Sequence, residues 1–223
     1  MYSFGARIRV ARTFTDGNVY MKPYVDLDAT YSRIRHFPTQ GNREKKYIGW
    51  TDEPIITGMK TKKNSFETKQ IIGSDLMRCK QTAAKIFSGV PYIENSNFRE
   101  CSFGDWEQKT YNELKDEAKY RNWLDDPRQI APPNGESMQA MEKRVLEALL
   151  ETVEKVEQPI IVTHGGPIRF ILTKFANIEK SFWDWEVPHG IMFTLHWPDK
   201  KDVLEGERCM SFSVEHLMEN ERM

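Results

Sequence analysis

The chain has 223 residues, which fits one α/β domain, because single domains of this class commonly reach about 200 to 250 residues. Its 32 basic and 33 acidic residues give a net charge of -1, so no long-range field favours nucleic acid or an anionic membrane as a partner. Any anion site must therefore be local.

The N-terminal residues 1–28 are predicted to form an arm or hairpin, followed by one domain over residues 29–223. Residues 6–14 and 19–25 alternate loosely around Asp16-Gly17, which is a hairpin signal. The first residues carry arginines and lack the apolar core of a signal peptide, and no stretch approaches about 18 apolar residues. We expect a soluble, cytoplasmic protein with no membrane partner.

The first half of the domain is predicted to contain two strands and one helix. TYSRIRHF (30–37) is a strand that breaks at Pro38, and residues 41–65 form a loop with one helical turn after Thr57. QIIGSD (70–75) is a second strand. LMRCKQTAAKIF (76–87) has apolar residues at helical spacing and follows as a helix.

The second half begins with an aromatic, proline-broken segment (96–137) of short helices, of which TYNELKDEA is the clearest, packed over one edge of the sheet. A long helix follows from Glu136, with Asn134 as its cap. Its apolar residues form one stripe over a span of twenty residues. PIIVTHGG (159–166) is a buried strand, a helix begins at Pro167, and GIMFTLHW (190–197) is the last strand.

This order of elements predicts an α/β fold, a three-layer α/β/α sandwich with a mostly parallel central sheet and helices on both faces. Cys79, Cys101 and Cys209 are odd in number and show no CxxC spacing, so we interpret them as ordinary thiols. Neither a disulfide framework nor a zinc site is expected.

Three of the predicted strands end in polar breaks, and parallel strands would bring these breaks to one rim of the sheet. Arg35, His36, Arg78 and His164 would then surround one point. Two arginines and two histidines repel one another unless they surround an anion, and arginine forks match phosphate oxygens in pairs. The rim therefore predicts a site for a dianion such as a phosphoryl group.

Six motifs in this order resemble the histidine phosphatase superfamily: RIRHF…N, GWTDEPI, SDLMRCKQTA, RECSFGDWE, PPNGES and VTHGGPIR. The superfamily includes cofactor-dependent phosphoglycerate mutases and many phosphatases, and the similarity runs from Tyr31 to Val187. ECSFGDWE, YRNWLDDP and PPNGESMQAMEKRV are similar to the α-ribazole phosphatase type of small bacterial enzyme. This resemblance implies the phosphoglycerate mutase-like fold.

The resemblance also implies a phosphomonoesterase that acts on a small phosphorylated metabolite and releases inorganic phosphate. His36 would attack phosphorus and form a phosphohistidine, for which it must be neutral, and the neighbouring arginines disfavour its charged form. Glu100 occupies the position of the general acid and base. His164 would share in catalysis.

The remaining roles implied by the resemblance are those of a phosphate clamp. Arg35, Arg78 and His164 would hold the equatorial oxygens, and Asn42 would add a neutral donor. No metal and no cofactor are needed, because these donors supply the positive charge. The segment 101–135 is expected to determine the substrate, which the sequence does not name, and the oligomeric state is equally open.

Each site residue also has a purely structural interpretation. Arg35 and His36 could be surface residues, His164 a turn histidine, Arg78 a partner of Asp75, and Glu100 a solvated carboxylate. Their joint occurrence in the order of the family favours the phosphate pocket. Trp50 and Trp106 are interpreted as packing residues, and Trp123, His189 and His196 are given no functional role.

The sequence departs from the family pattern at Phe37, where the family has glycine, so we expect Phe37 to line or narrow the pocket. The segment from Thr57 to Ser74 is short for the family's first helix, and residues 1–28 are predicted to cover the surface left bare. Phe37 keeps a second function open, a catalytically impaired pseudo-phosphatase that binds a phosphorylated ligand or partner. A phosphoglycerate mutase is a further alternative.

Overall fold

Six strands form one mixed sheet in the order β5-β4-β6-β3-β7-β8. The computed structural model describes residues 8–15, 18–25, 29–62 and 68–219. β5, β4, β6 and β3 run parallel to one another, whereas β7 and β8 are antiparallel to their neighbours. The strands are β3 (Ala29–Arg35), β4 (Ile71–Gly73), β5 (Tyr92–Glu94), β6 (Ile160–Thr163), β7 (Ile191–Trp197) and β8 (Ser211–His216). The mostly parallel sheet is confirmed.

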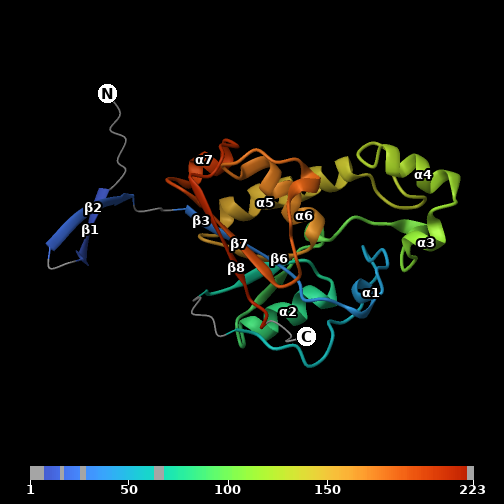
Figure 1. Cartoon of the computed structure of the whole chain (residues 1–223), viewed down its shortest axis with the longest axis horizontal. Coiled ribbons are helices and arrows are strands. Elements are labelled where there is room, and N and C mark those ends of the chain that lie inside the picture. The colour runs from blue at the N-terminus through green and yellow to red at the C-terminus, as the bar shows by residue number, and fades with distance from the viewer. Residues whose placement is uncertain (1–7, 16–17, 26–28, 63–67, 220–223) are drawn as a thin grey trace.

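Helices cover both faces of this sheet, as predicted (Figure 1). α2 (Met77–Ile86) contacts β4 and β6 on one face, while α5 (Met138–Lys155), α6 (Gly165–Phe175) and α7 (Lys200–Leu204) cover the other. The shorter helices are α1 (Gln40–Arg43), α3 (Tyr111–Leu114), α4 (Ala118–Asp125) and the 3₁₀ helices η1 (Ser96–Phe98), η2 (Gly104–Trp106) and η3 (Phe182–Asp184).

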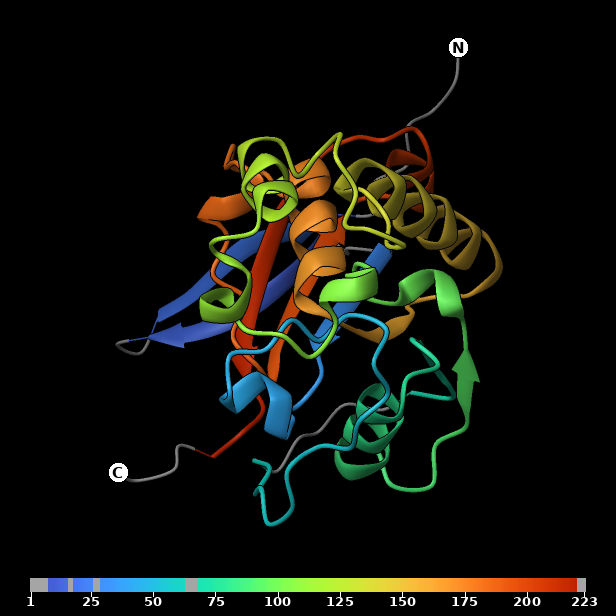
Figure 2. The same cartoon turned by 90° about the vertical axis from the view of Figure 1, so that its right-hand side faces the viewer.

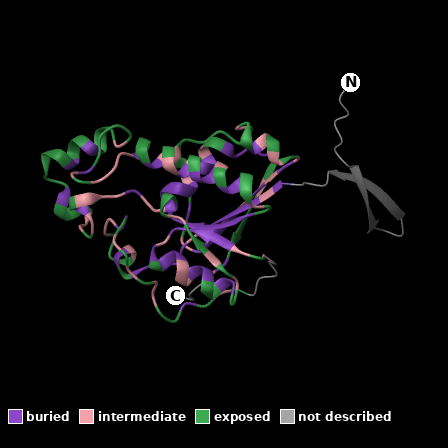
Figure 3. Cartoon of the chain, turned by 180° about the vertical axis from the view of Figure 1, so that it is seen from behind, coloured by how far each residue is buried: buried purple, intermediate pink, exposed green. Residues whose placement is uncertain are grey.

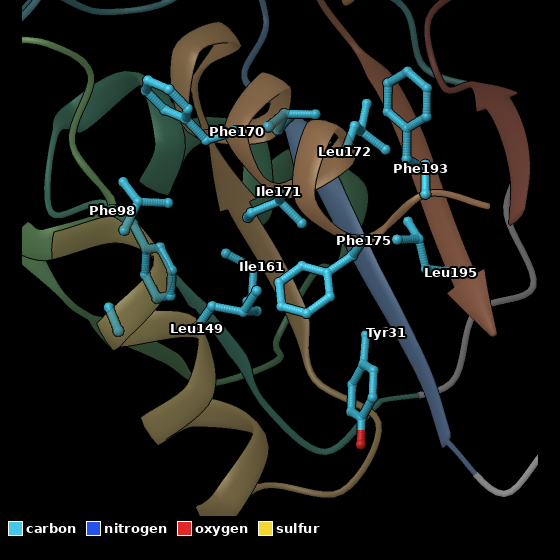
Figure 4. Close-up of a cluster of buried hydrophobic side chains, with 14 of the residues drawn as sticks. Tyr31, Phe98, Leu149, Ile161, Phe170, Ile171, Leu172, Phe175, Phe193 and Leu195 are labelled. Carbon is cyan, nitrogen blue, oxygen red and sulfur yellow. The ribbon is translucent and has the colours of Figure 1, made fainter. Parts of the chain in front are cut away.

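The apolar runs of the central strands supply two cores because successive strand residues face opposite sides of the sheet. Ile72 and Ile161 pack with α5 and α6, whereas Ile71 and Val162 pack with α2. Figure 4 shows the first core, in which Phe175 lies between Ile161 and Tyr31. The central strands β3, β4, β6 and β7 are mostly buried and the outer helix surfaces are exposed in Figure 3, so both helix layers bury their inner faces against the sheet.

The aromatic segment forms a third, smaller cluster under α3 and α4. Trp106, Leu114, Tyr120 and Trp123 are its buried members, and the hydroxyls of Tyr47 and Tyr120 are 2.5 Å apart. Figure 2 looks onto the end of the molecule that carries α1, α3 and α4. The predicted short helices and the packing role of Trp106 are confirmed.

Two local predictions, a helical turn and a helix cap, are wrong. The helical turn lies at the start of the predicted loop, in α1, whereas Thr57 and Gly58 form a hydrogen-bonded turn without a helix. Ser137 caps α5, because its side chain accepts from the backbone N–H of Ala140, while Asn134 has a left-handed φ of 58° and donates to Asp105 instead.

α6 begins at Gly165, two residues before Pro167, which still lies in the first turn where proline costs no hydrogen bond. The short strands β5 and β8 were not predicted. β5 has only three residues and β8 is largely exposed, so neither has the apolar pattern of a buried strand.

β1 (Ile8–Thr15) and β2 (Asn18–Val25) pair antiparallel as a separate two-stranded sheet. The Asp16-Gly17 turn between them lies outside the described residues, and the division into an arm and one domain stays a prediction. Within the described part of the chain, no helix is long and apolar enough to cross a membrane.

Candidate active site

The carboxyl ends of the parallel strands β3, β4 and β6 lie at one rim, as their alternating register requires. The sheet ladder continues one residue beyond the strands, because His36 N–H donates to the Thr163 carbonyl over 3.0 Å and Ser74 N–H donates to the Val162 carbonyl over 3.0 Å. This brings His36 beside His164, the first residue after β6. The centroids of the two imidazole rings are 4.9 Å apart.

His36 is buried and held in one orientation. Its Nδ1 lies 2.7 Å from the Phe37 carbonyl oxygen, which can only accept, so Nδ1 carries the proton and Nε2 keeps its lone pair. Burial lowers the pKa of His36 well below its usual value, and Arg78, His189 and Arg35 lower it further. The imidazole is therefore neutral at pH 7, with a nucleophilic nitrogen.

Arg78, the second residue of α2, is fully buried and connects the rim to the loop after α1. It donates to the carbonyls of Thr51 and Gly49 over 2.7 and 2.6 Å, and from Nε to His164 Nδ1 over 3.3 Å. The predicted alternative, a pair with Asp75, is wrong, because Asp75 pairs with Arg99. Three of the five guanidinium N–H groups are thus used to fix the clamp.

His164 is fully buried and has protein contacts on both ring nitrogens. Since Nδ1 accepts from Arg78, the proton lies on Nε2, which is 3.5 Å from Cys79 Sγ. The pKa of His164 is well below its usual value because of burial and then because of Arg78, His36 and Arg35. Burial raises the pKa of the Cys79 thiol to about 12, so this sulfur is not a competing nucleophile at neutral pH.

Arg35, the residue before His36, has its guanidinium next to the backbone of Gly165. It donates to the Val187 carbonyl, and its Nε is buried with no hydrogen-bond partner among the described residues. Burial lowers the pKa of Arg35 to about 10, which still leaves it charged at pH 7.

Glu100 enters the site from the loop after η1. Its carboxylate accepts from the backbone N–H groups of Cys101 and Gly166, each over 3.0 Å. A Cβ on Gly166 would overlap this carboxylate, which explains why a glycine stands at the second position of α6 despite its low helix propensity. Arg144 of α5 donates to the Glu100 carbonyl over 2.9 Å and pairs with Glu136, so the loop is fastened from behind.

Asn42 is tied to the cap of α1. Its amide oxygen accepts from Thr39 N–H over 3.2 Å, and the Thr39 hydroxyl accepts from Asn42 N–H over 3.2 Å. Only its amide NH₂ group could therefore donate to a phosphoryl oxygen. The structure brings Arg35, His36, Arg78 and His164 together, with Glu100 at Gly166, the second residue of α6.

The sequence profile described as histidine phosphatase superfamily (branch 1) matches residues 33–208 of this chain. The chain belongs to the histidine phosphatase superfamily. The resemblance drawn from the six motifs is therefore confirmed, and the arrangement of rim residues described above belongs to a histidine phosphatase fold.

Individual members of the superfamily match over most of their length. The adenosylcobalamin/alpha-ribazole phosphatase of Escherichia coli K12 is 27% identical over 199 residues, which cover 82% of this chain and 97% of that protein. The alpha-ribazole phosphatase of Shigella flexneri superposes with a TM-score of 0.66 at 22% identity, covering 85% of this chain and 96% of that one. At this identity the structural likeness shows the fold alone.

Bacillus stearothermophilus YhfR superposes with a TM-score of 0.65 at 25% identity, and the match covers 76% of this chain and 91% of that one. The matches therefore cover more than nine tenths of the length of each of these three proteins.

Phe37, the departure from the family glycine, does not line or narrow the pocket. Its side chain is fully buried in the core beneath α2, with Ile34, Cys79 and Ala83 as members of the same cluster. Its carbonyl orients His36 and its N–H donates to the Thr82 hydroxyl over 2.8 Å. Only the backbone of residue 37 thus serves the nucleophile, and the side chain points away.

Trp50 is not a packing residue, since 44% of its surface is exposed. Its indole N–H donates to the Glu100 carbonyl over 3.0 Å, and the Arg99 guanidinium lies 4.8 Å from its ring. The prediction failed because a tryptophan in a loop gives no periodic signal that separates core from rim.

A cavity of about 320 Å³ adjoins Glu100 and Gly166. Most of its lining is apolar or aromatic. The charged side chains of the lining are those of Glu100 and Arg169. The aromatic members of the lining are Tyr47, Phe103, Trp123, Phe182 and Trp183. Trp123, to which the sequence assigned no role, therefore contributes to this wall.

The three free cysteines are buried, in agreement with their interpretation as ordinary thiols. Within the described residues, no group of three or more His, Cys, Asp or Glu side chains is placed to hold a metal ion.

Sequence reasoning missed His189, whose ring centroid lies 5.2 Å from that of His36. It precedes β7, and β7 is antiparallel to β3, so the beginning of β7 meets the carboxyl end of β3. The available signal was a His-Gly pair next to a strand, as in His164-Gly165. The direction of β7 could not be read from its sequence.

Proposed function

We propose that this histidine phosphatase is a phosphomonoesterase that hydrolyses a small phosphorylated metabolite through a phosphohistidine on His36, without a metal ion. The observation that carries the proposal is a neutral His36 with its Nε2 lone pair unprotonated, between two arginines and a second histidine. Membership of the superfamily and the alpha-ribazole phosphatase relatives support it.

In the first step, Nε2 of His36 attacks phosphorus while the bond from phosphorus to the ester oxygen breaks. Glu100 gives its proton to the leaving oxygen, so the alcohol departs neutral. Arg35 and the two remaining N–H groups of Arg78 hold the oxygens on which charge develops, with Asn42 as a neutral donor and His164 fixing the Arg78 fork. The products are the alcohol and the phosphohistidine.

In the second step, Glu100 takes a proton from water, and the oxygen of that water attacks phosphorus. The bond from His36 Nε2 to phosphorus breaks, and inorganic phosphate leaves with His36 restored to its neutral form. Because Nδ1 donates to the Phe37 carbonyl throughout, the ring keeps the same tautomer in both steps.

The leaving group is proposed to occupy the cavity beside Glu100. Its volume of about 320 Å³ lies at the small end of ligand pockets, which favours a metabolite over a phosphorylated protein segment. The aromatic lining favours an alcohol with an apolar face. Several lining residues, including Phe103 and Trp123, come from the segment 101–135 that was expected to determine the substrate.

The pseudo-phosphatase alternative loses its motivation, because the Phe37 side chain lies in the core and leaves the nucleophile in place. Relatives named probable phosphoglycerate mutase match 59% of this chain, against 82% for the alpha-ribazole phosphatase of Escherichia coli, so a mutase is the less favoured alternative. The cytoplasmic location stays a prediction.

The test is hydrolysis of p-nitrophenyl phosphate by the full chain, with EDTA present and absent. We expect turnover that EDTA does not change, and loss of at least about 10³-fold in His36→Ala. A denaturing quench with labelled substrate should trap an acid-labile phosphohistidine in the wild type. Hydrolysis that EDTA abolishes, or that survives in His36→Ala, would show that the proposal is wrong.

A further inference from the structure

A third histidine stands beside the nucleophile, on the side opposite to the strands β6 and β4. The loop that carries His189 is fastened to Arg35 twice. Gly190 N–H donates to the Arg35 carbonyl over 3.1 Å, and the Arg35 side chain donates to the Val187 carbonyl. The rings of His36 and His189 meet edge to face at 61°. The position of His189 is therefore fixed by hydrogen bonds between its loop and Arg35, the residue next to the nucleophile.

Two polar nitrogen atoms here are buried without a partner among the described residues. One is Nε2 of His189 and the other is Nε of Arg35. Buried donors without an acceptor are rare, because they lose water and gain nothing in return. Nε of Arg35 can only donate, so the missing partner is an acceptor.

The charges around His189 point to the same kind of partner. Burial and then Arg35 and Arg78 lower the pKa of His189 to about 3, so it is a neutral imidazole at the pH at which the arginines are charged. A neutral imidazole adds a donor without adding to the repulsion between the two guanidinium groups.

We propose that His189 is a further phosphate-binding residue of this chain, which donates from Nε2 to an oxygen of the phosphoryl group bound at His36. This inference rests on the proposed phosphoryl site, but it adds a residue outside the motifs of the family resemblance. The ligand class is a phosphate monoester dianion or an oxyanion of the same shape. His189 and Arg35 then complete their hydrogen bonds on one ligand, from the antiparallel side of the sheet.

The experiment measures binding of orthovanadate and inorganic phosphate to the full chain by calorimetry, together with kcat and KM on p-nitrophenyl phosphate. His189→Phe keeps a ring against His36 but removes the donor, and His189→Asn restores an N–H group. His196→Phe is the matched control, because His196 lies near the far end of β7, the strand that follows His189, and contacts Thr30 over 3.2 Å.

We expect His189→Phe to weaken vanadate binding and to lower kcat/KM by roughly 10- to 100-fold, the usual range for a hydrogen bond to a charged group. His189→Asn should recover most of this loss, and His196→Phe should bind vanadate as the wild type does. Thermal midpoints without ligand should agree within a few degrees between His189→Phe and His189→Asn, while the rise caused by vanadate is lost only in the former.

Wild-type vanadate affinity in His189→Phe would overturn the inference and leave the proposed function intact. Equal losses in His189→Phe and His189→Asn would overturn it as well, since ring packing would then explain the effect. Binding of vanadate that depends on His189 in a chain without turnover would instead support the inference and remove the proposed function.

Discussion

The ring of Phe37 lies against Gly190, at a point where no larger residue fits. A Cβ on Gly190 would be 3.0 Å from Cε1 of Phe37 and would overlap Met218. Gly190 has a φ of 68°, which glycine adopts without strain. The family glycine is thus replaced by a bulky side chain at one position, and a glycine just before the neighbouring strand β7 provides the room.

This relationship predicts that Gly190→Ala is much more harmful than a comparable glycine substitution elsewhere. Gly89 has a φ of 81°, but a Cβ added there would meet no atom within 4 Å, so Gly89→Ala should cost only the backbone strain of about 1 kcal/mol. Gly190→Ala should cost about 1 to 3 kcal/mol more, because it also crowds the core. Urea denaturation of both variants measures the difference, and equal losses would contradict the packing account.

Glu100→Gln separates acid catalysis from phosphate binding. The amide keeps the shape of the carboxylate at Gly166 but cannot supply a proton, so turnover of alkyl phosphates should fall by roughly 10² to 10⁴-fold while vanadate still binds. Aryl phosphates, whose leaving oxygen is a weaker base, should lose less. Turnover on both esters for both proteins is the measurement, with burst kinetics to detect the phosphohistidine.

Equal and small losses on the two esters would show that Glu100 is not the acid. Asp105 and Glu107 in the same loop would then be the carboxylates to test. Glu107 is already engaged by the backbone N–H groups of Gly49, Trp50 and Thr51, which makes Asp105 the more available of the two.

Arg144 is predicted to support catalysis without touching the substrate. It donates to the carbonyls of Asn97, Arg99 and Glu100 and pairs with Glu136, so Arg144→Met leaves several partners unsatisfied. We expect a loss of about 2 to 4 kcal/mol in unfolding free energy and a lower kcat in the folded protein.

Arg128→Met is the control for Arg144→Met, because Arg128 also pairs with a glutamate, Glu142, but its side chain is 56% exposed. Its loss should stay within about 1 kcal/mol. Denaturation and steady-state kinetics distinguish the two, and a kcat in Arg144→Met equal to that of Arg128→Met would argue against a role in holding Glu100.

The buried histidines predict a stability that falls on mild acidification. The pKa values of His36, His164 and His189 are lowered in the folded state, so below about pH 6.5 the unfolded chain binds more protons than the folded one. Each such histidine should remove up to about 1.4 kcal/mol per pH unit as the pH falls below that value, down to its folded pKa.

Unfolding free energies between pH 7.5 and 5.5 measure this slope, in a window above the titration of ordinary carboxylates. His189→Asn removes one of the three histidines. The slope of unfolding free energy against pH should then be smaller by up to about 1.4 kcal/mol per pH unit, the contribution of one proton. An unchanged slope in His189→Asn would mean that His189 is not buried in its neutral form.

Local sequence was enough to locate the strand ends that carry the chemistry. The breaks after Arg35, Gly73 and Thr163 follow short apolar runs, and parallel pairing of such runs leaves their polar ends at one rim of the sheet. The apolar stripe of α5 and the continuous apolar run of β6 are likewise local patterns, which can be read directly from the sequence.

Several details around that rim became known only from the folded chain. The Asn42 amide oxygen accepts from the Thr39 N–H at the cap of α1, the Phe37 ring packs in the core beside Gly190, and His189 lies just before the antiparallel strand β7. The positions of Phe37 and His189 do not follow from spacing, because each depends on a contact between segments far apart in the chain. The Asn42 contact is local, with Thr39 three residues away. The direction of a strand and the space between packed layers depend on the whole sheet. They therefore decide where His189 and Phe37 lie, which the sequence motifs do not specify.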